Sequence, residues 1–101
     1  SFAYQFSVPP AWHAADLSYT FMDPSSPEPG LNVTLAVILQ RYFTNFAATG
    51  SPNSVTGAYL PKFTAGEGSV VQNLGSAMVG PMLDTAINVE QCKWWQKGLF
   101  I

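Results

Sequence analysis

The sequence has 101 residues and a formal net charge of -2, with only 10% charged residues and 48% hydrophobic ones. A soluble domain usually has about 25% charged residues, and a small domain has a large surface to cover. This composition therefore predicts a part of something larger. Four cations give no basic stripe, so we expect no nucleic-acid partner. The longest strongly apolar run, residues 35–39, is far below the ~20 residues of a spanning helix, so we expect no transmembrane segment.

The chain has one histidine, His13, and one cysteine, Cys92. They cannot complete a metal site without other ligands, and no glycine-rich nucleotide loop is present, so neither a metal nor a cofactor is expected. A single cysteine cannot close a disulfide within the chain, so Cys92 is expected to pair outside it or to stay a free thiol. Asn32 begins the one Asn-x-Thr triplet, which predicts an N-glycan if the protein is secreted.

The first elements predict a strand that ends just before the histidine. Aromatic residues alternate with smaller ones over residues 2–8, which is typical of a strand, and Pro9-Pro10 must end it. His13 then lies on the loop after a strand end, where open α/β sheets collect ligand-handling residues. We expect a short helical turn over residues 14–21 and a loop over 23–30.

The strongest helix signal covers residues 33–48. Six apolar residues recur at helical spacing and form one face: Leu35, Ile38, Leu39, Tyr42, Phe43 and Phe46. Gly50 fits a C-terminal cap, and Asn32 fits an N-cap, a role that competes with its role as a glycan acceptor.

Three more elements follow. Residues 59–63 predict an extended connector with apolar anchors, and residues 69–74 predict a second strand. A last helix is expected from about Asp84, with Ile87, Gln91, Trp94 and Trp95 on one side as packing residues. The mixture predicts an α/β fold without repeats and without a second domain.

The chain contains no complete active site. No serine has glycines at both the -2 and the +2 position, so the Gly-x-Ser-x-Gly nucleophile elbow is missing, and no pair of carboxylates converges. In the α/β-hydrolase fold the catalytic residues run Ser, Asp or Glu, then His along the sequence. A C-terminal segment would hold the histidine alone. A merely structural His13 remains the competing interpretation.

Four stretches, in order, resemble the C-terminal end of type-B carboxylesterases, which include cholinesterase-like and fungal lipase-like esterases. They are "FAYQFSVPPAWHAADLSYTF", "LQRYFTNFAATGSPN", "YLPKF" and "CKWWQ". The resemblance implies that residues 1–101 form the C-terminal segment of a single α/β-hydrolase domain. The sequence departs from the family pattern at Ala14, where glycine is common, and at Leu60, where tryptophan is usual. At Leu60 we expect a change in packing.

The resemblance also implies roles for individual residues. His13 would be the catalytic base of the triad. Asp16 matches the family's acidic position three residues later and would support the site from outside the triad, since the family's triad acid comes from an upstream loop. A helix-start cap or a plain surface charge is equally open for Asp16. Cys92 matches a position that in many members bridges to an upstream cysteine.

We therefore expect a histidine-bearing segment of a secreted serine carboxylesterase or lipase, inactive alone. Its partners would be the N-terminal remainder of the same hydrolase, which supplies serine and acid, and a carboxylic ester substrate. The alternative is a non-catalytic cholinesterase-like protein that acts by protein–protein binding. An independent small interaction domain with a hydrophobic surface is a third hypothesis.

Overall fold

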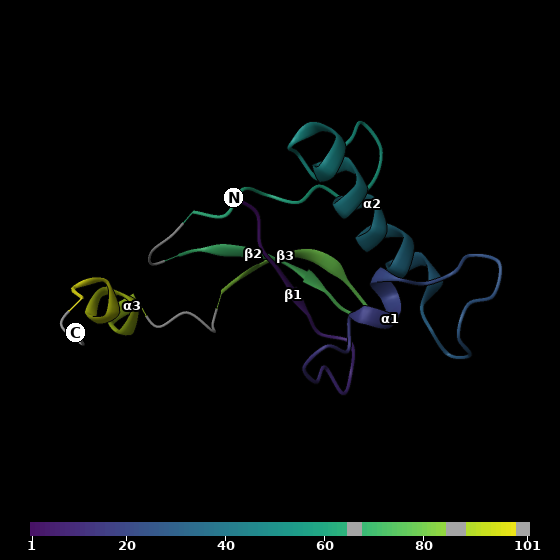
Figure 1. The fold of residues 1–101 in the computed structure, drawn as a ribbon, viewed down its shortest axis with the longest axis horizontal. Coiled ribbons are helices and arrows are strands. Elements are labelled where there is room, and N and C mark those ends of the chain that lie inside the picture. Colours follow the sequence, from purple (N-terminus) through teal and green to yellow (C-terminus); the bar gives the residue numbers. More distant parts are fainter. Residues whose placement is uncertain (65–67, 85–88, 99–101) are drawn as a thin grey trace.

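A computed structural model describes residues 1–64, 68–84 and 89–98 (Figure 1). Its elements are β1 (Tyr4–Phe6), α1 (Leu17–Thr20), α2 (Val33–Thr49), β2 (Val70–Leu74), β3 (Val79–Leu83) and α3 (Val89–Gln96). Helices and a small sheet are mixed, in agreement with the predicted α/β class. Among the described residues, no helix is long and apolar enough to cross a membrane.

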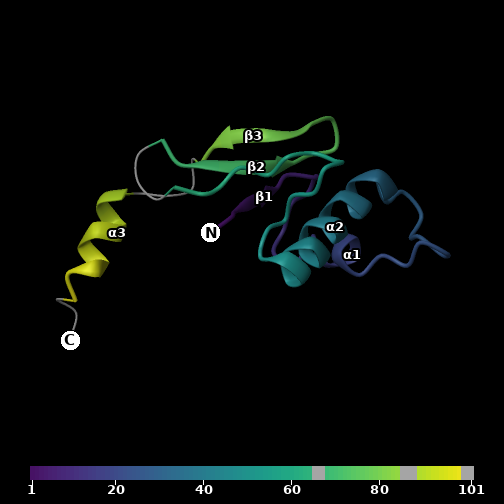
Figure 2. The same ribbon diagram turned by 90° about the horizontal axis from the view of Figure 1, so that it is seen from above.

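The three strands form one sheet in the order β1-β2-β3. β1 runs parallel to β2, with Tyr4 opposite Gln72 and Phe6 opposite Leu74, whereas β3 runs antiparallel to β2. Figure 2 shows α1 and α2 together on one face of this sheet. The parallel pair matters for the site, because the loop that carries His13 leaves the carboxyl end of β1 beside the carboxyl end of β2.

The core lies between α2 and the sheet. Its buried members are Tyr19, Met22, Leu35, Ala36, Leu39, Tyr42, Leu60 and Leu74. Each aromatic residue at the start of the chain meets another ring edge to face; the pairs are Phe2–Phe46, Tyr4–Phe43 and Phe6–Tyr19. The alternation seen in the sequence thus directs these three rings to the helical side of the sheet.

α2 has the boundaries that its sequence predicts, within one residue. Asn32 caps its first turn through a hydrogen bond of 3.1 Å from the backbone N–H of Leu35 to Oδ1. Gly50 ends it with φ of 77°, in the left-handed region that glycine adopts without strain. The predicted apolar face is buried in part: Leu35, Leu39 and Tyr42 are buried and Ile38 is partly buried, whereas Phe43 and Phe46 are exposed.

A polar pair also links α2 to the sheet. Gln72 is almost fully buried and donates from Nε2 to Tyr42 Oη at 3.2 Å, and Tyr42 donates in turn to the carbonyl of Ala58 at 2.8 Å. The structure gives Gln72 Oε1 no hydrogen-bond partner among the described residues.

Other elements differ in part from the prediction. The first strand covers three residues rather than seven, and the short helical turn is reduced to α1. In the predicted connector, Leu60 is buried as an anchor, which confirms its packing role, whereas Tyr59 is exposed. The last helix was predicted to start at about Asp84, but Asp84 donates its backbone N–H to the carbonyl of Ser69 at 2.8 Å and the described helix begins at Val89. The predicted helix residue Ile87 lies outside the described residues. The predicted packing residues of this helix, Trp94 and Trp95, touch each other with ring centroids 4.7 Å apart, but each is about half exposed.

Candidate functional site

His13 lies on an exposed loop of residues 7–16 directly after β1, where the sequence predicted it. Three tight turns build this loop, and each is closed by one backbone hydrogen bond. The bonds are Ala11 N–H to Val8 carbonyl at 2.8 Å, Ala15 N–H to Trp12 carbonyl at 3.0 Å, and Leu17 N–H to Ala14 carbonyl at 3.1 Å. His13 is the second residue of the middle turn, so its side chain projects from a hydrogen-bonded frame.

The backbone is strained on both sides of His13. Ala11 has φ of 52° and Ala14 has φ of 65°, both in the left-handed region that residues with a Cβ rarely adopt. Glycine, which the type-B carboxylesterases that this chain resembles commonly have at the position of Ala14, adopts this conformation without strain. Backbone strain of this kind is common where a structure must present a functional side chain in one orientation.

The end of the loop is tied back to β1 by a side-chain hydrogen bond. Tyr4 Oη donates to Asp16 Oδ2 at 2.7 Å, across twelve residues of sequence. Burial, the hydrogen bond to Asp16 and the negative charge of that carboxylate raise the pKa of Tyr4 to about 12. Asp16 stands at the N-cap position of α1, but its side chain does not cap that helix. The side chain of Asp16 is thus bonded to Tyr4 and not to the first turn of α1.

The beginning of the loop is tied to β2. Ser7 donates its backbone N–H to the carbonyl of Leu74 at 2.9 Å, and its Oγ donates to Asn73 Oδ1. The His13 loop is therefore held at its first residue by β2 and at its last residue by β1. The attachment of Ser7 lies at the carboxyl end of the parallel strand pair, whereas Tyr4 is the first residue of β1.

Large apolar side chains surround the loop without being covered. Trp12, next to His13, is 75% exposed, and Phe21, at the end of α1, is 78% exposed. Leu17, one helical turn before Phe21, is half exposed. Exposed aromatic groups of this size agree with the composition, which predicts surface to be covered by further structure.

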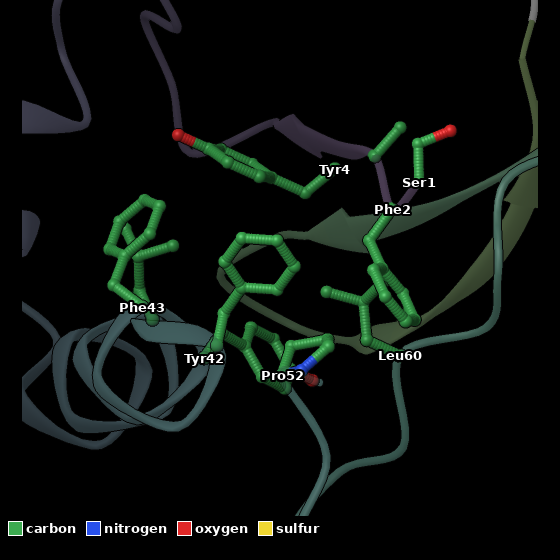
Figure 3. A pocket seen from close by; sticks show the side chains of 10 residues that line it. Ser1, Phe2, Tyr4, Tyr42, Phe43, Pro52 and Leu60 are labelled. Atoms are coloured by element: carbon green, nitrogen blue, oxygen red, sulfur yellow. The ribbon is translucent and has the colours of Figure 1, made fainter. Parts of the chain in front are cut away.

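The chain also has an apolar pocket between β1 and α2. It has a volume of about 290 Å³ and is lined by Ser1, Phe2, Ala3, Tyr4, Leu39, Tyr42, Phe43, Phe46, Pro52 and Leu60. Figure 3 shows Tyr4 and Phe2 on the strand side of the pocket and Tyr42 and Phe43 on the helix side. Leu60 lines this pocket, at a position where the type-B carboxylesterases that the chain resembles usually have tryptophan. The lining holds no residue of the His13 loop, so this pocket and the histidine are separate features; Tyr4 lines the pocket and its hydroxyl is bonded to Asp16 at the end of the loop.

Two of the predicted site residues, His13 and Asp16, lie on the same loop, but they do not form a catalytic dyad. No hydrogen bond to the His13 side chain is present among the described residues, and the oxygen of Asp16 that is engaged faces Tyr4. No group of three or more potential metal ligands occurs in residues 1–64, 68–84 and 89–98. The sequence reasoning did not single out Tyr4, because a strand tyrosine gives no local sign of its distant partner.

The two remaining predicted sites lie away from the loop. Asn32 uses Oδ1 for its cap. An N-glycan would be attached at Nδ2, so the capping role and the predicted glycan role are chemically compatible. Cys92 is exposed on α3 as a free thiol, a position that an outside cysteine can reach.

Comparison with known proteins finds similarity to two carboxylesterases. The chain is 33% identical over 99 residues to "Carboxylesterase patB" of Aspergillus clavatus and 31% identical over 100 residues to "Carboxylesterase patB" of Penicillium expansum. Each alignment covers 98% of this chain but only 17% of the relative, so the chain spans about a sixth of the length of these proteins. No family model matches the chain, and no solved structure matches it. The similarity supports a relationship to carboxylesterases and, at that coarse level, to ester hydrolysis.

Proposed function

We propose that this chain is the C-terminal, histidine-bearing segment of a serine carboxylesterase or lipase of the α/β-hydrolase fold. In this proposal a serine and a Glu or Asp from the rest of the protein complete a triad with His13, and the substrate is a carboxylic ester. The observation that supports it most is the placement of His13 on a strained loop at the carboxyl end of a parallel strand pair. The similarity to two carboxylesterases over nearly all of the chain supports the same activity.

In the proposed chemistry, one ring nitrogen of His13 transfers the proton and the other is held by the acid of the triad. His13 takes the proton of the serine hydroxyl as that oxygen attacks the ester carbonyl, and it then gives the proton to the departing alcohol. An imidazole suits both steps because its ordinary pKa of about 6.5 lies near neutral pH. The side chain is exposed in this segment, so both ring nitrogens are open to partners from the remainder of the protein.

Secretion forms part of the proposal. An N-glycan on Asn32 and a disulfide from Cys92 to a cysteine outside the chain would both form in the secretory pathway. The exposure of Cys92 and the use of Oδ1 rather than Nδ2 in the Asn32 cap are compatible with these modifications.

Fluorophosphonate labelling of the full-length protein tests the proposed activity. We expect the native protein to label and to hydrolyse short-chain nitrophenyl esters, and His13→Ala to lower kcat by at least about 10³-fold. Arg41→Ala, which removes an exposed side chain from α2, is the matched control and should label like the native protein. Native labelling that His13→Ala leaves unchanged would contradict the role of His13. A full-length protein that does not label at all would favour a non-catalytic, protein-binding relative.

A further inference from the structure

We propose that Tyr4 is a positioning residue for the reaction: its hydroxyl holds Asp16 and thereby fixes the loop that presents His13. This inference rests on the proposed function for its catalytic consequence. Its structural part, the ordering of the loop by Tyr4, stands on geometry alone.

The geometry makes Asp16 the attachment point of the loop. The Asp16 carbonyl accepts the backbone N–H groups of Tyr19 and Thr20 at 3.1 and 2.9 Å, so its backbone begins α1. Its side chain is therefore not needed for the helix and is bonded to Tyr4 instead. Only two residues lie between His13 and Asp16, and two overlapping turns join them. A displacement of Asp16 consequently moves the histidine.

Tyr4 is well suited to hold that attachment. Its ring is half-buried and packs edge to face against Phe43 of α2, with 6.1 Å between ring centroids, and its backbone is paired with β2. The hydroxyl is thus held by the sheet and by the largest helix at once. A hydrogen bond to a charged acceptor is about twice as strong as a neutral one, so this single contact can hold a loop with a strained backbone.

The loop has a second attachment, and the two differ in what they restrain. Ser7 and Asn73 fix the first residue of the loop beside β2, before the Pro9-Pro10 segment and the strained Ala11. Without the bond from Tyr4, the far end of the eight residues from Val8 to Ala15 would be held only through α1, whose Tyr19 is buried and whose carbonyls accept from Gln40. An error of about 1 Å in the placement of a catalytic group can lower a rate about 100-fold, so a small movement is sufficient to matter.

A double-mutant cycle in the full-length protein tests the inference. Tyr4→Phe keeps the ring and its contact with Phe43 but removes the donor, and Asp16→Ala removes the acceptor. We expect each to lower kcat about 10-fold with KM little changed, and the double variant to be no worse than either one. Asp16→Asn keeps an oxygen acceptor for Tyr4 and should restore most of the lost kcat. Tyr19→Phe, which removes a hydroxyl from the same region but not from this bond, should behave like the native protein.

Two outcomes of the cycle overturn the inference. If Tyr4→Phe lowers kcat equally with and without Asp16, Tyr4 does not act through that residue. If Asp16→Asn loses as much activity as His13→Ala, Asp16 takes part in the reaction itself rather than holding the loop.

Amide hydrogen exchange separates this inference from the proposed function. We expect faster exchange over residues 8–16 in Tyr4→Phe than in Tyr19→Phe, whether or not the protein is an esterase. Unchanged exchange in Tyr4→Phe overturns the inference even if the native protein hydrolyses esters. An inactive native protein whose loop loosens in Tyr4→Phe refutes the proposed function and leaves the ordering role of Tyr4 supported.

Discussion

Asn32 Oδ1 accepts a hydrogen bond of 3.1 Å from the backbone N–H of Leu35, and this one contact ends a long loop and begins α2. The sequence presented two roles for Asn32, an N-cap and a glycan acceptor, as competitors. The structure removes the conflict, because the cap occupies the oxygen of the amide and an N-glycan would be attached to its nitrogen.

Three variants of the full-length protein separate these two roles. Asn32→Ala removes both, Thr34→Ala removes only the glycan signal, and Asn32→Asp removes the signal but keeps an oxygen for the cap. We expect a secreting host to yield one glycan fewer in all three variants, seen as a mobility shift that glycosidase treatment abolishes. After deglycosylation, only Asn32→Ala should be less stable, by about 1 kcal/mol. Native protein without a glycan on Asn32 would contradict the proposed modification.

The backbone strain beside His13 predicts that glycine stabilises the protein at position 14 and destabilises it at the adjacent position 15. Ala14 has a positive φ, so Ala14→Gly relieves a conformation that costs an alanine roughly 1–2 kcal/mol, less the entropy that glycine loses on folding. We expect a net stabilisation of about 0.5 kcal/mol. The neighbouring Ala15 is not among the residues with positive φ, so Ala15→Gly should lower the free energy of unfolding by about 0.5–1 kcal/mol.

Thermal unfolding of the two single variants, beside the native full-length protein, measures this difference. A loss of stability in Ala14→Gly as large as that in Ala15→Gly would show that the left-handed backbone at Ala14 costs nothing. The same comparison bears on the resemblance, because the esterases that this chain resembles commonly have glycine after the histidine.

The sequence was sufficient for elements whose signals are local. α2 combines an apolar face, a capping side chain and a terminal glycine, and all three lie within the helix or next to it. The strand before His13 and the loop after it were likewise marked by alternation and by Pro9-Pro10. These features need no knowledge of the rest of the fold.

Elements that depend on distant contacts were missed. β3 contains Pro81, which argues against a strand unless that strand lies at an edge, and only pairing with β2 makes β3 an edge strand among the described residues. The bond between Tyr4 and Asp16 was missed for a related reason. It joins a strand to a helix start, and neither partner shows a pattern that points to the other.

The candidate site also has one part that local sequence signals predicted and another that depends on distant contacts. The position of His13 after a strand end followed from proline and alternation. Its frame of turns and its two attachments required coordinates, because they depend on the register of β1 against β2. The composition, which is too apolar for a free domain of this size, predicted exposed apolar side chains in general, but it did not identify Trp12 and Phe21 as exposed.

The raised pKa of Tyr4 predicts how stability depends on pH at the alkaline end. The pKa of Tyr4 is about 12 in the folded protein, whereas a tyrosine in an unfolded chain has a pKa of about 10. Below pH 10 both states hold the proton, and the full contribution to stability is present. Between about pH 10 and 12 the unfolded state loses the proton first, so the free energy of unfolding must fall as pH rises.

Unfolding midpoints of the full-length protein across this pH range test the sign. The decline should be shallower in Tyr4→Phe, which has no phenol to titrate at that position. It should not vanish, because burial also raises the pKa of Tyr42. Asp16→Ala removes the hydrogen bond and the charge that support the shift, so phenolate absorbance should show Tyr4 titrating at a lower pH in that variant. An equal decline in native protein and Tyr4→Phe would show that the proton on Tyr4 does not contribute to stability.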